Sequence, residues 1–249
     1  MQKISGHEVL TVQGNFWAEK IVVATHYPII NIPGFYFLRQ HQERSYCLAL
    51  SGCENPDGMY LGIDGERLSF RGAGEFLLLG GCGHRTGHQK RCYARAKLEE
   101  YAKKYFPQAQ VEAFWAAQDC MPHDGIPFIG KYSMFTPNLY VITGFQKWGI
   151  TSSMVSAMIL TDALCGIKNP YEKVFSPQRL HLKASFGNFM IDVGINGKGL
   201  TKGMFHKPKK TELGLPNGHG GIVTIERQRY ASYKDEEGKL HKISAKCSH

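Results

Sequence analysis

The sequence has no long hydrophobic segment. Its longest apolar runs, such as Phe76 to Leu79, are far shorter than the roughly 20 residues that a membrane-spanning helix needs. No basic, apolar and small-residue leader stands at its start either. With 43% hydrophobic and 20% charged residues, the 249-residue chain has the composition of a folded globular protein. We therefore expect a cytoplasmic protein without a membrane segment.

Two motifs are also missing. The seven cysteines include no C-x-x-C pair, which argues against a disulfide framework and against a self-contained zinc site. No G-x-G-x-x-G follows a predicted strand, so the chain lacks the sequence that holds the pyrophosphate of a dinucleotide. The net charge of +9 would suit a nucleic-acid partner, but the basic residues are dispersed except between Lys198 and Lys210. That Gly- and Pro-bearing cluster is more typical of a solvated linker.

A strand, a turn and a helix are predicted between Leu139 and Leu164. Leu139 to Ile142 is apolar and β-prone, and apolar residues then recur at three- and four-residue spacings from Met154 onwards. Thr151 to Ser153 are good N-cap types. The backbone N–H groups at such a helix start attract anionic or electron-rich ligand atoms. The segment is therefore either a cofactor site or an ordinary αβ unit.

The first residues predict a hairpin that leads into a buried strand. Glu8 to Gln13 and Phe16 to Ala24 are the strands, and Gly14-Asn15 is a turn dipeptide. Ala24 and Thr25 stand at the carboxyl end of the second strand. In open α/β sheets ligands bind at that end.

The middle of the chain predicts a mainly antiparallel sheet followed by one helix. Strands are expected at 44–50, 58–64, 66–71 and 75–80, and an amphipathic helix at Cys92 to Phe106. The sequence GGCGHRTGH, from Gly80 to His88, has three interpretations: a structural turn, an active-site loop and a metal site. The turn is favoured, because the motif lacks the Lys-Ser/Thr of a phosphate loop and its histidines do not share a helix face.

Three segments in order resemble flavoproteins of the D-amino-acid oxidase and glycine oxidase superfamily. These are IVVATHYPI, DCMPHDGIPFIG at Asp119 to Gly130, and TGFQKWGITSSMVSAMILTDALCG. The resemblance spans Glu8 to Arg179. It implies FAD as cofactor and a mixed α+β / α/β fold, in which a partial, Rossmann-like FAD-binding domain carries an inserted, mainly antiparallel substrate domain.

The last stretch resembles the opening strands of a Rieske iron-sulfur domain. Strands are predicted at 221–226, 229–234 and 240–244, and Cys247-Ser248-His249 would be the first ligand box. A Rieske [2Fe-2S] centre needs two Cys and two His in total, so Cys247 and His249 would be half of a ligand set. An exposed tail is the alternative. The domains expected from both resemblances are 1–33 (partial FAD-binding domain), 34–117 (substrate domain), 118–185 (C-terminal part of the FAD-binding domain), 186–213 (linker) and 214–249 (truncated Rieske-like domain).

The superfamily resemblance also implies site residues. The expected cofactor-binding residues are Ala24, Thr25, Asp124, Gly125, Gly144, Phe145, Lys147, Trp148, Gly149, Ile150 and Thr151. Lys147 and Trp148 stand where the family usually has glycines, which puts the shape of the substrate pocket in question. Arg44, Tyr46 and His84 are candidate substrate contacts, although an ordinary structural role is favoured for each, because an Arg or Tyr on a half-buried strand is usually a rim residue.

The function implied is the oxidation of an amine or amino acid by hydride transfer to flavin, with electrons passed to a Rieske [2Fe-2S] centre. No residue identifies the substrate or the electron acceptor. Relative to a flavoprotein fused to a Rieske domain, the chain is expected to be truncated at both ends. Two other hypotheses remain: a non-catalytic remnant that binds no cofactor tightly, and a basic nucleic-acid-binding protein.

Overall fold

The computed structural model describes residues 3–30, 32–63, 65, 67–86, 91–179, 214–226 and 228–245, and the isolated positions 187, 190 and 194. The chain divides into two compact units, Met1–Asp192 and Val193–His249. Apart from those isolated positions, the predicted linker lies outside the described residues.

A small antiparallel sheet begins the first unit. Its strands are β1 (Lys3–Ser5), β2 (Glu8–Thr11) and β3 (Gly14–Trp17), in the order β1-β2-β3. The predicted hairpin is present, but the single strand expected from Phe16 to Ala24 is divided. β3 ends at Trp17, and a bend at Glu19 and Lys20 separates it from β4 (Ile21–Val23).

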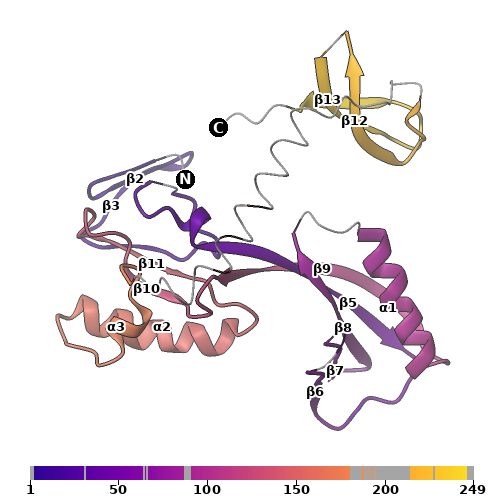
Figure 1. Cartoon of the computed structure of the whole chain (residues 1–249), viewed down its shortest axis with the longest axis horizontal. Coiled ribbons are helices and arrows are strands. Elements are labelled where there is room, and N and C mark those ends of the chain that lie inside the picture. The colour runs from indigo at the N-terminus through magenta and orange to yellow at the C-terminus, as the bar shows by residue number, and fades with distance from the viewer. Residues whose placement is uncertain are drawn as a thin grey trace. The chain divides into compact units, whose positions relative to one another are not determined.

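A second sheet contains the strand that leads into the turn predicted after Thr143. It has the order β10-β11-β4, where β10 is Phe128–Lys131 and β11 is Leu139–Thr143. β4 runs parallel to β11, and β10 runs antiparallel to it. Helix α2 (Gly149–Leu164) lies along one face (Figure 1), where Ile129, Tyr140 and Ile159 form a buried cluster. The short helix α3 (Glu172–Phe175) follows it. The carboxyl ends of β4 and β11 therefore lie at the same edge of this sheet.

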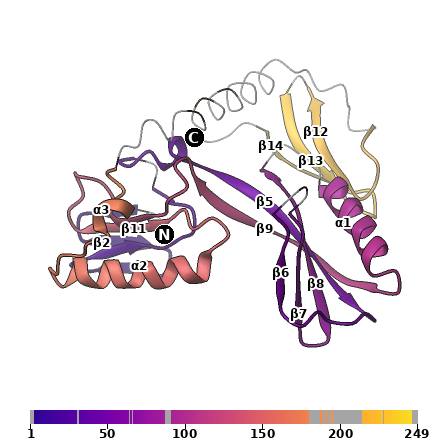
Figure 2. The same ribbon diagram turned by 60° about the horizontal axis from the view of Figure 1, so that its bottom comes forward.

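The largest sheet is antiparallel throughout, as predicted. Its order is β6-β7-β8-β5-β9, with β6 (Met59–Leu61), β7 (Ser69–Ala73), β8 (Phe76–Arg85), β5 (Gln40–Ser51) and β9 (Gln110–Pro122). The 3-10 helix η1 (Tyr36–Leu38) precedes β5. Helix α1 (Arg91–Tyr105) covers one face of the sheet (Figure 2). Leu48, Leu79 and Leu98 are fully buried there, so hydrophobic burial holds the helix on the sheet.

The prediction that Gly80 to His88 forms a turn is wrong for its described part. Residues up to Arg85 belong to β8 and pair with β5, and 87 and 88 lie outside the described residues. The glycines serve close packing in the strand. A β-carbon at Gly80 would lie 2.5 Å from Ser69 Oγ on β7, and the irregular register opposite Arg44 and Tyr46 accommodates Cys82 at φ 54°.

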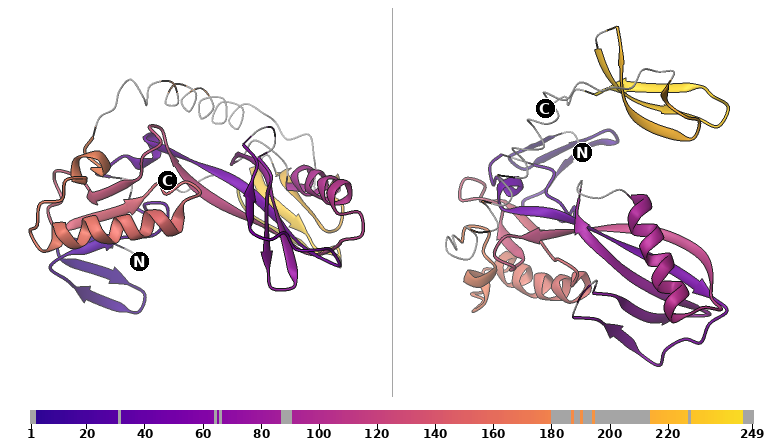
Figure 3. Two further views of the ribbon diagram at one scale, coloured as in Figure 1. Left: turned by 90° about the horizontal axis from the view of Figure 1, so that it is seen from below. Right: turned by 45° about the vertical axis from the view of Figure 1, so that its right-hand side comes forward.

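The second unit is a three-stranded antiparallel sheet. Its strands are β12 (His219–Ile225), β13 (Gln228–Lys234) and β14 (Leu240–Ser244), in sequential order (Figure 3). The three strands predicted here are confirmed. Val223 and Leu215 are buried in this unit, and Asp235 pairs with His241 at a distance of 2.7 Å.

Candidate functional site

The turn between β11 and α2 has a backbone that its sequence explains. Gly144 has φ 76°, in the left-handed region that glycine tolerates best. A β-carbon there would overlap the Pro122 ring, so the position also needs the smallest residue. Gln146 has φ 53°, and its N–H donates to the Cys120 carbonyl at 3.0 Å, which ties the turn to the end of β9. The turn is therefore held at two points against the end of β9.

Helix α2 begins without a side-chain cap. Trp148 is the N-cap residue and makes no cap hydrogen bond, and no acidic residue stands in the first turn. The predicted capping residues lie inside the helix instead, where Ser153 Oγ donates to the Ile150 carbonyl at 2.7 Å. Space is open around the position of a Gly149 β-carbon. The positive end of the helix dipole is thus available to an electron-rich group.

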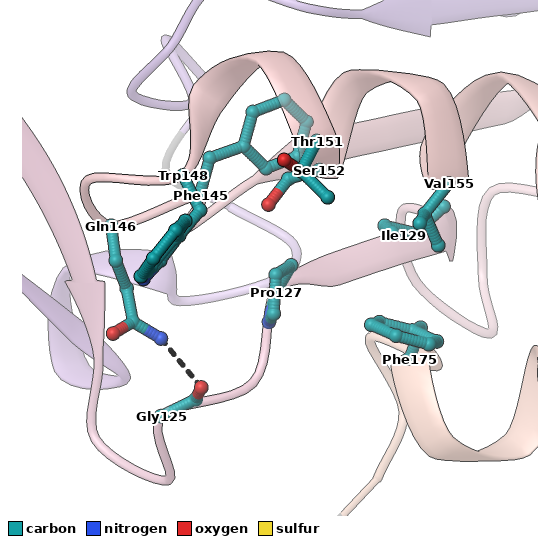
Figure 4. Close-up of a pocket in the computed structure, with 10 residues that line it drawn as sticks. All are labelled: Gly125, Pro127, Ile129, Phe145, Gln146, Trp148, Thr151, Ser152, Val155 and Phe175. Carbon is teal, nitrogen blue, oxygen red and sulfur yellow. Dashed lines mark hydrogen bonds between the residues drawn. The ribbon is translucent and has the colours of Figure 1, made fainter. Parts of the chain in front are cut away.

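A pocket of about 330 Å³ lies beside this helix start (Figure 4). Residues from four segments surround it: the 125–127 turn, β10, the turn before α2 with the first half of that helix, and α3. The lining residues are Gly125, Pro127, Ile129, Phe145, Gln146, Trp148, Thr151, Ser152, Val155 and Phe175. Most of this lining is apolar, as in ordinary small-molecule sites, and a few polar groups are added to it.

The structure brings together only part of the predicted cofactor-binding set. Gly125, Phe145, Trp148 and Thr151 line the pocket, whereas Gly144 is buried and is not part of the lining. Asp124 is buried in an ion pair with Arg179. The remaining members are exposed: Ala24, Thr25, Lys147, Gly149 and Ile150. Ala24 and Thr25 follow β4, next to β11 in the sheet, so their predicted role at the same sheet edge stays open.

Sequence reasoning missed several lining residues. Ser152 and Val155 follow Trp148 and Thr151 at a spacing of four, so helical periodicity could have assigned them to the same face. Pro127 and Ile129 lie within the DCMPHDGIPFIG segment that was already singled out. Nothing local marks Phe175, because it reaches the pocket from a separate helix.

The three candidate substrate contacts lie together on the large sheet. Arg44 and His84 are register partners, and Tyr46 donates its hydroxyl to His84 Nε2 at 2.9 Å. His84 Nδ1 donates to the Arg85 carbonyl at 2.8 Å, which leaves Nε2 as the acceptor. Tyr46 is only 2% exposed and belongs to the cluster that packs under α1. Their role as substrate contacts stays a prediction.

Charged side chains gather near Lys147. Its Nζ lies 3.2 Å from the position of a Gly83 β-carbon, so the lysine extends over β8. Glu43 and Asp119 are register partners on β5 and β9, and the positive charge of Lys147 acts to lower the pKa of both carboxyl groups. Burial raises the pKa of Asp119, whereas the contact with His41 lowers the pKa of Glu43. Ser45 Oγ donates to Asp119 at 3.4 Å.

The predicted metal ligands Cys247 and His249 lie outside the described residues. Among the side chains that the structure does place, no group of three or more His, Cys, Asp and Glu could hold a metal ion. In the same described ranges, no helix has the length and apolarity needed to cross a membrane.

The first unit matches a known family and resembles solved structures. Residues 2–163 match the family model described as "FAD dependent oxidoreductase" (DAO). The structure resembles glycine oxidase from Geobacillus kaustophilus, with a TM-score of 0.61 and 20% identity over 71% of this chain and 50% of that one. It also resembles L-proline dehydrogenase from P. horikoshii, with a TM-score of 0.58 and 18% identity over 70% of this chain and 50% of that one.

The match to one relative covers residues of both units. YhfW of Bacillus subtilis (strain 168), named as a candidate Rieske 2Fe-2S iron-sulfur protein, is 34% identical over 235 residues, which are 92% of this chain and 46% of that protein. The chain thus spans about half the length of the relatives that it matches. The mixed α/β fold predicted from the sequence is confirmed by the structural neighbours, and the family match covers well over half of the residues. This chain belongs to the FAD-dependent oxidoreductase (DAO) family.

Proposed function

We propose that the chain supplies the C-terminal side of a FAD site and the substrate-covering sheet of an oxidoreductase acting on an amine or amino acid. The observation that carries this proposal is the uncapped start of α2, which stands beside the 330 Å³ pocket. FAD, when bound, would accept a hydride from the C–H next to the substrate nitrogen. The cofactor-binding roles predicted for Gly144 to Thr151 are part of the proposal.

The residues present fit the electron-rich edge of a flavin. The N–H groups of the first helical turn favour an acceptor or a partial negative charge. Gly149 allows a ring to approach closely, since nothing lies within 4 Å of its missing β-carbon. Phe145 and Trp148 offer apolar surface beside the same turn.

The proposed substrate is a small amine or amino acid. The named activities of the structural neighbours support it, since they include glycine oxidase, L-proline dehydrogenase and L-amino acid deaminase from Proteus vulgaris. Lys147 could pair with a substrate carboxylate, and Asp119 with an amine nitrogen, because both side chains belong to the charged group beside the flavin-facing turn. Arg44, Tyr46 and His84 are retained as alternative contacts.

The proposed electron route leads to a Rieske centre. Its support is the name of the Bacillus subtilis relative and the three strands that precede Cys247 and His249. As half of a ligand set, those two residues would hold no cluster without another Cys and His. Iron and sulfide analysis of the purified chain tests this, and a stoichiometric cluster retained by this chain alone would contradict the half-set assignment.

FAD titration of the purified chain tests the cofactor proposal. We expect FAD to quench the tryptophan fluorescence of the chain, and visible absorbance that stays with the protein after desalting would argue for a self-sufficient site. The variant Thr151→Glu places a negative charge at the helix start and should weaken binding by roughly tenfold, or about 1.4 kcal/mol. Thr161→Glu is the matched control, as it lies in the same helix but away from the pocket.

Two outcomes oppose the proposal. A chain that stays colourless and unquenched at saturating FAD would support the non-catalytic remnant. Equal affinity of the two glutamate variants would remove the helix start from the site. The basic nucleic-acid binder predicts strongly salt-dependent binding of duplex DNA, which a low-salt gel-shift experiment can detect.

A further inference from the structure

Arg179 makes an unusually complete set of contacts at a position after α3. Its Nε and Nη2 donate to both carboxylate oxygens of Asp124, at 2.7 and 2.9 Å. Its guanidinium also donates to four backbone carbonyls, those of Ile126, Pro127, Phe175 and Ser176. The side chains of Arg179 and Asp124 are 4% and 5% exposed. Such a paired and hydrogen-bonded geometry is what a buried ion pair requires.

These contacts fix the 124–127 turn. Asp124 Oδ1 also accepts the Ile126 N–H at 3.2 Å, and Gly125 N–H donates to the Pro122 carbonyl at 3.1 Å. Gly125 has φ 71°, in the left-handed region that glycine adopts readily. The carboxylate of Asp124 therefore orders the turn only as long as Arg179 neutralises and orients it.

The 124–127 turn is also bonded to the proposed flavin-facing segment, Gly144 to Thr151. Gln146 Nε2 donates to the Gly125 carbonyl at 2.5 Å, the contact drawn in Figure 4. Gly125, Pro127 and Gln146 line the pocket, and so does Phe175, whose carbonyl Arg179 binds. Arg179 itself is absent from the lining. It thus connects two sides of the pocket while its own atoms lie outside it.

We propose that Arg179 is a positioning residue for the candidate flavin pocket. Through Asp124 it sets the Gly125 carbonyl, and through that carbonyl it sets Gln146 and the turn that enters α2. The proposal rests on the proposed function where it concerns FAD, but its geometric part concerns this chain alone.

Arg39 provides a matched control. Its guanidinium carbon lies 4.4 Å from the centre of the Phe128 ring, and that of Arg179 lies 4.1 Å from the same centre. Arg39 also donates to the Arg179 carbonyl at 3.4 Å. None of its described hydrogen bonds reaches a pocket-lining residue. Arg39→Met therefore removes a cation from the same aromatic ring, and with it some positive charge near Asp124, but it removes no described hydrogen bond of the 124–127 turn.

The first experiment measures backbone hydrogen exchange in the full chain without cofactor. The double variant Arg179→Met with Asp124→Leu removes both charges together, so that neither is left buried and unpaired. The backbone carbonyls that Arg179 bound lose a donor, so the melting temperature should fall. We expect exchange in the 123–127 and 144–148 segments to rise by more than it rises in the strands of the large sheet, which report the general loss of stability. Arg39→Met should leave both segments as in the wild type. Exchange at 144–148 that rises no more than in those strands in the double variant would overturn the proposal.

The second experiment measures FAD affinity and the visible circular dichroism of the bound flavin. Arg179→Lys keeps the charge but not the bidentate geometry, and should weaken FAD binding by roughly tenfold and alter the flavin spectrum. If Arg39→Met has the same effect, the contribution of Arg179 is general packing on Phe128, and the proposal fails. If the wild-type chain binds no FAD, the proposed function fails, and the exchange experiment still decides the positioning role.

Discussion

Gly144 packs directly against Pro122, where β11 ends beside the end of β9. A β-carbon at position 144 would overlap the proline ring, and the backbone φ of 76° disfavours any other residue as well. The turn that leads into α2 therefore depends on a glycine for two separate reasons.

Gly144→Ala should destabilise the chain more than the same change at Gly166. Gly166 has φ 73° but open space around its missing β-carbon, so alanine there carries only the backbone cost, about 1–2 kcal/mol. At Gly144 the overlap adds about 1–3 kcal/mol. Urea unfolding of both variants measures the difference. Equal losses would show that Pro122 moves aside freely.

Tyr46→Phe should cost about 1 kcal/mol of unfolding free energy. It removes the buried hydroxyl that donates to His84 Nε2 and leaves that nitrogen without its described partner. Tyr93→Phe removes the same group from an exposed side chain and should be neutral. Thermal melts of both variants test this. An unchanged melting temperature for Tyr46→Phe would mean that the contact contributes nothing net.

Glu43 and Asp119 should contribute to stability with opposite dependence on pH. The folded-state pKa of Glu43 is lowered by His41, so its contribution is present above its ordinary value near 4.5 and is lost as the pH falls through the lower folded value. Burial raises the pKa of Asp119, so its ionisation opposes folding once the pH rises above its ordinary value near 3.8.

Paired variants separate the two carboxyl groups. The quantity compared is the unfolding free energy at pH 7 minus that at pH 3. Asp119→Asn should make this difference larger than in the wild type, and Glu43→Gln should make it smaller. Urea unfolding at the two pH values measures each change against the wild type. A change of the same sign in both variants would contradict the assignment.

The thiol of Cys165 should react faster with a disulfide reagent than those of Cys47 and Cys120. Cys165 is exposed at the end of α2, whereas burial raises the pKa of both other thiols to about 11, which keeps them protonated near neutral pH. Cys165→Ser should remove one equivalent from the fast phase, measured by the absorbance of the released thiolate. Cys120→Ser should leave the fast phase intact, and a loss there would place a reactive thiol in the core.

Local sequence determined the elements and the identity of the site segment. The change from β-prone residues to helical spacing after Thr143 predicted β11, the turn and α2, because hydrophobic periodicity and glycine conformation act over a few residues. The strands of the second unit followed from the same rule. The order of three motifs identified the family, which the match over residues 2–163 confirms.

Only the tertiary structure decided which side chains meet. Asp124 was predicted to support a flavin cleft, but its partner Arg179 lies 55 residues further along the chain, at a position that no short-range pattern marks. The direction of Tyr46 under α1 and the place of Gly80 to Arg85 in β8 likewise depend on strand register and on what packs above the sheet. Periodicity assigns a residue to a face of its own element, whereas the neighbour on that face is set by packing between distant segments. The predicted flavin-facing turn therefore came from the sequence, and the contacts that hold it came from the fold.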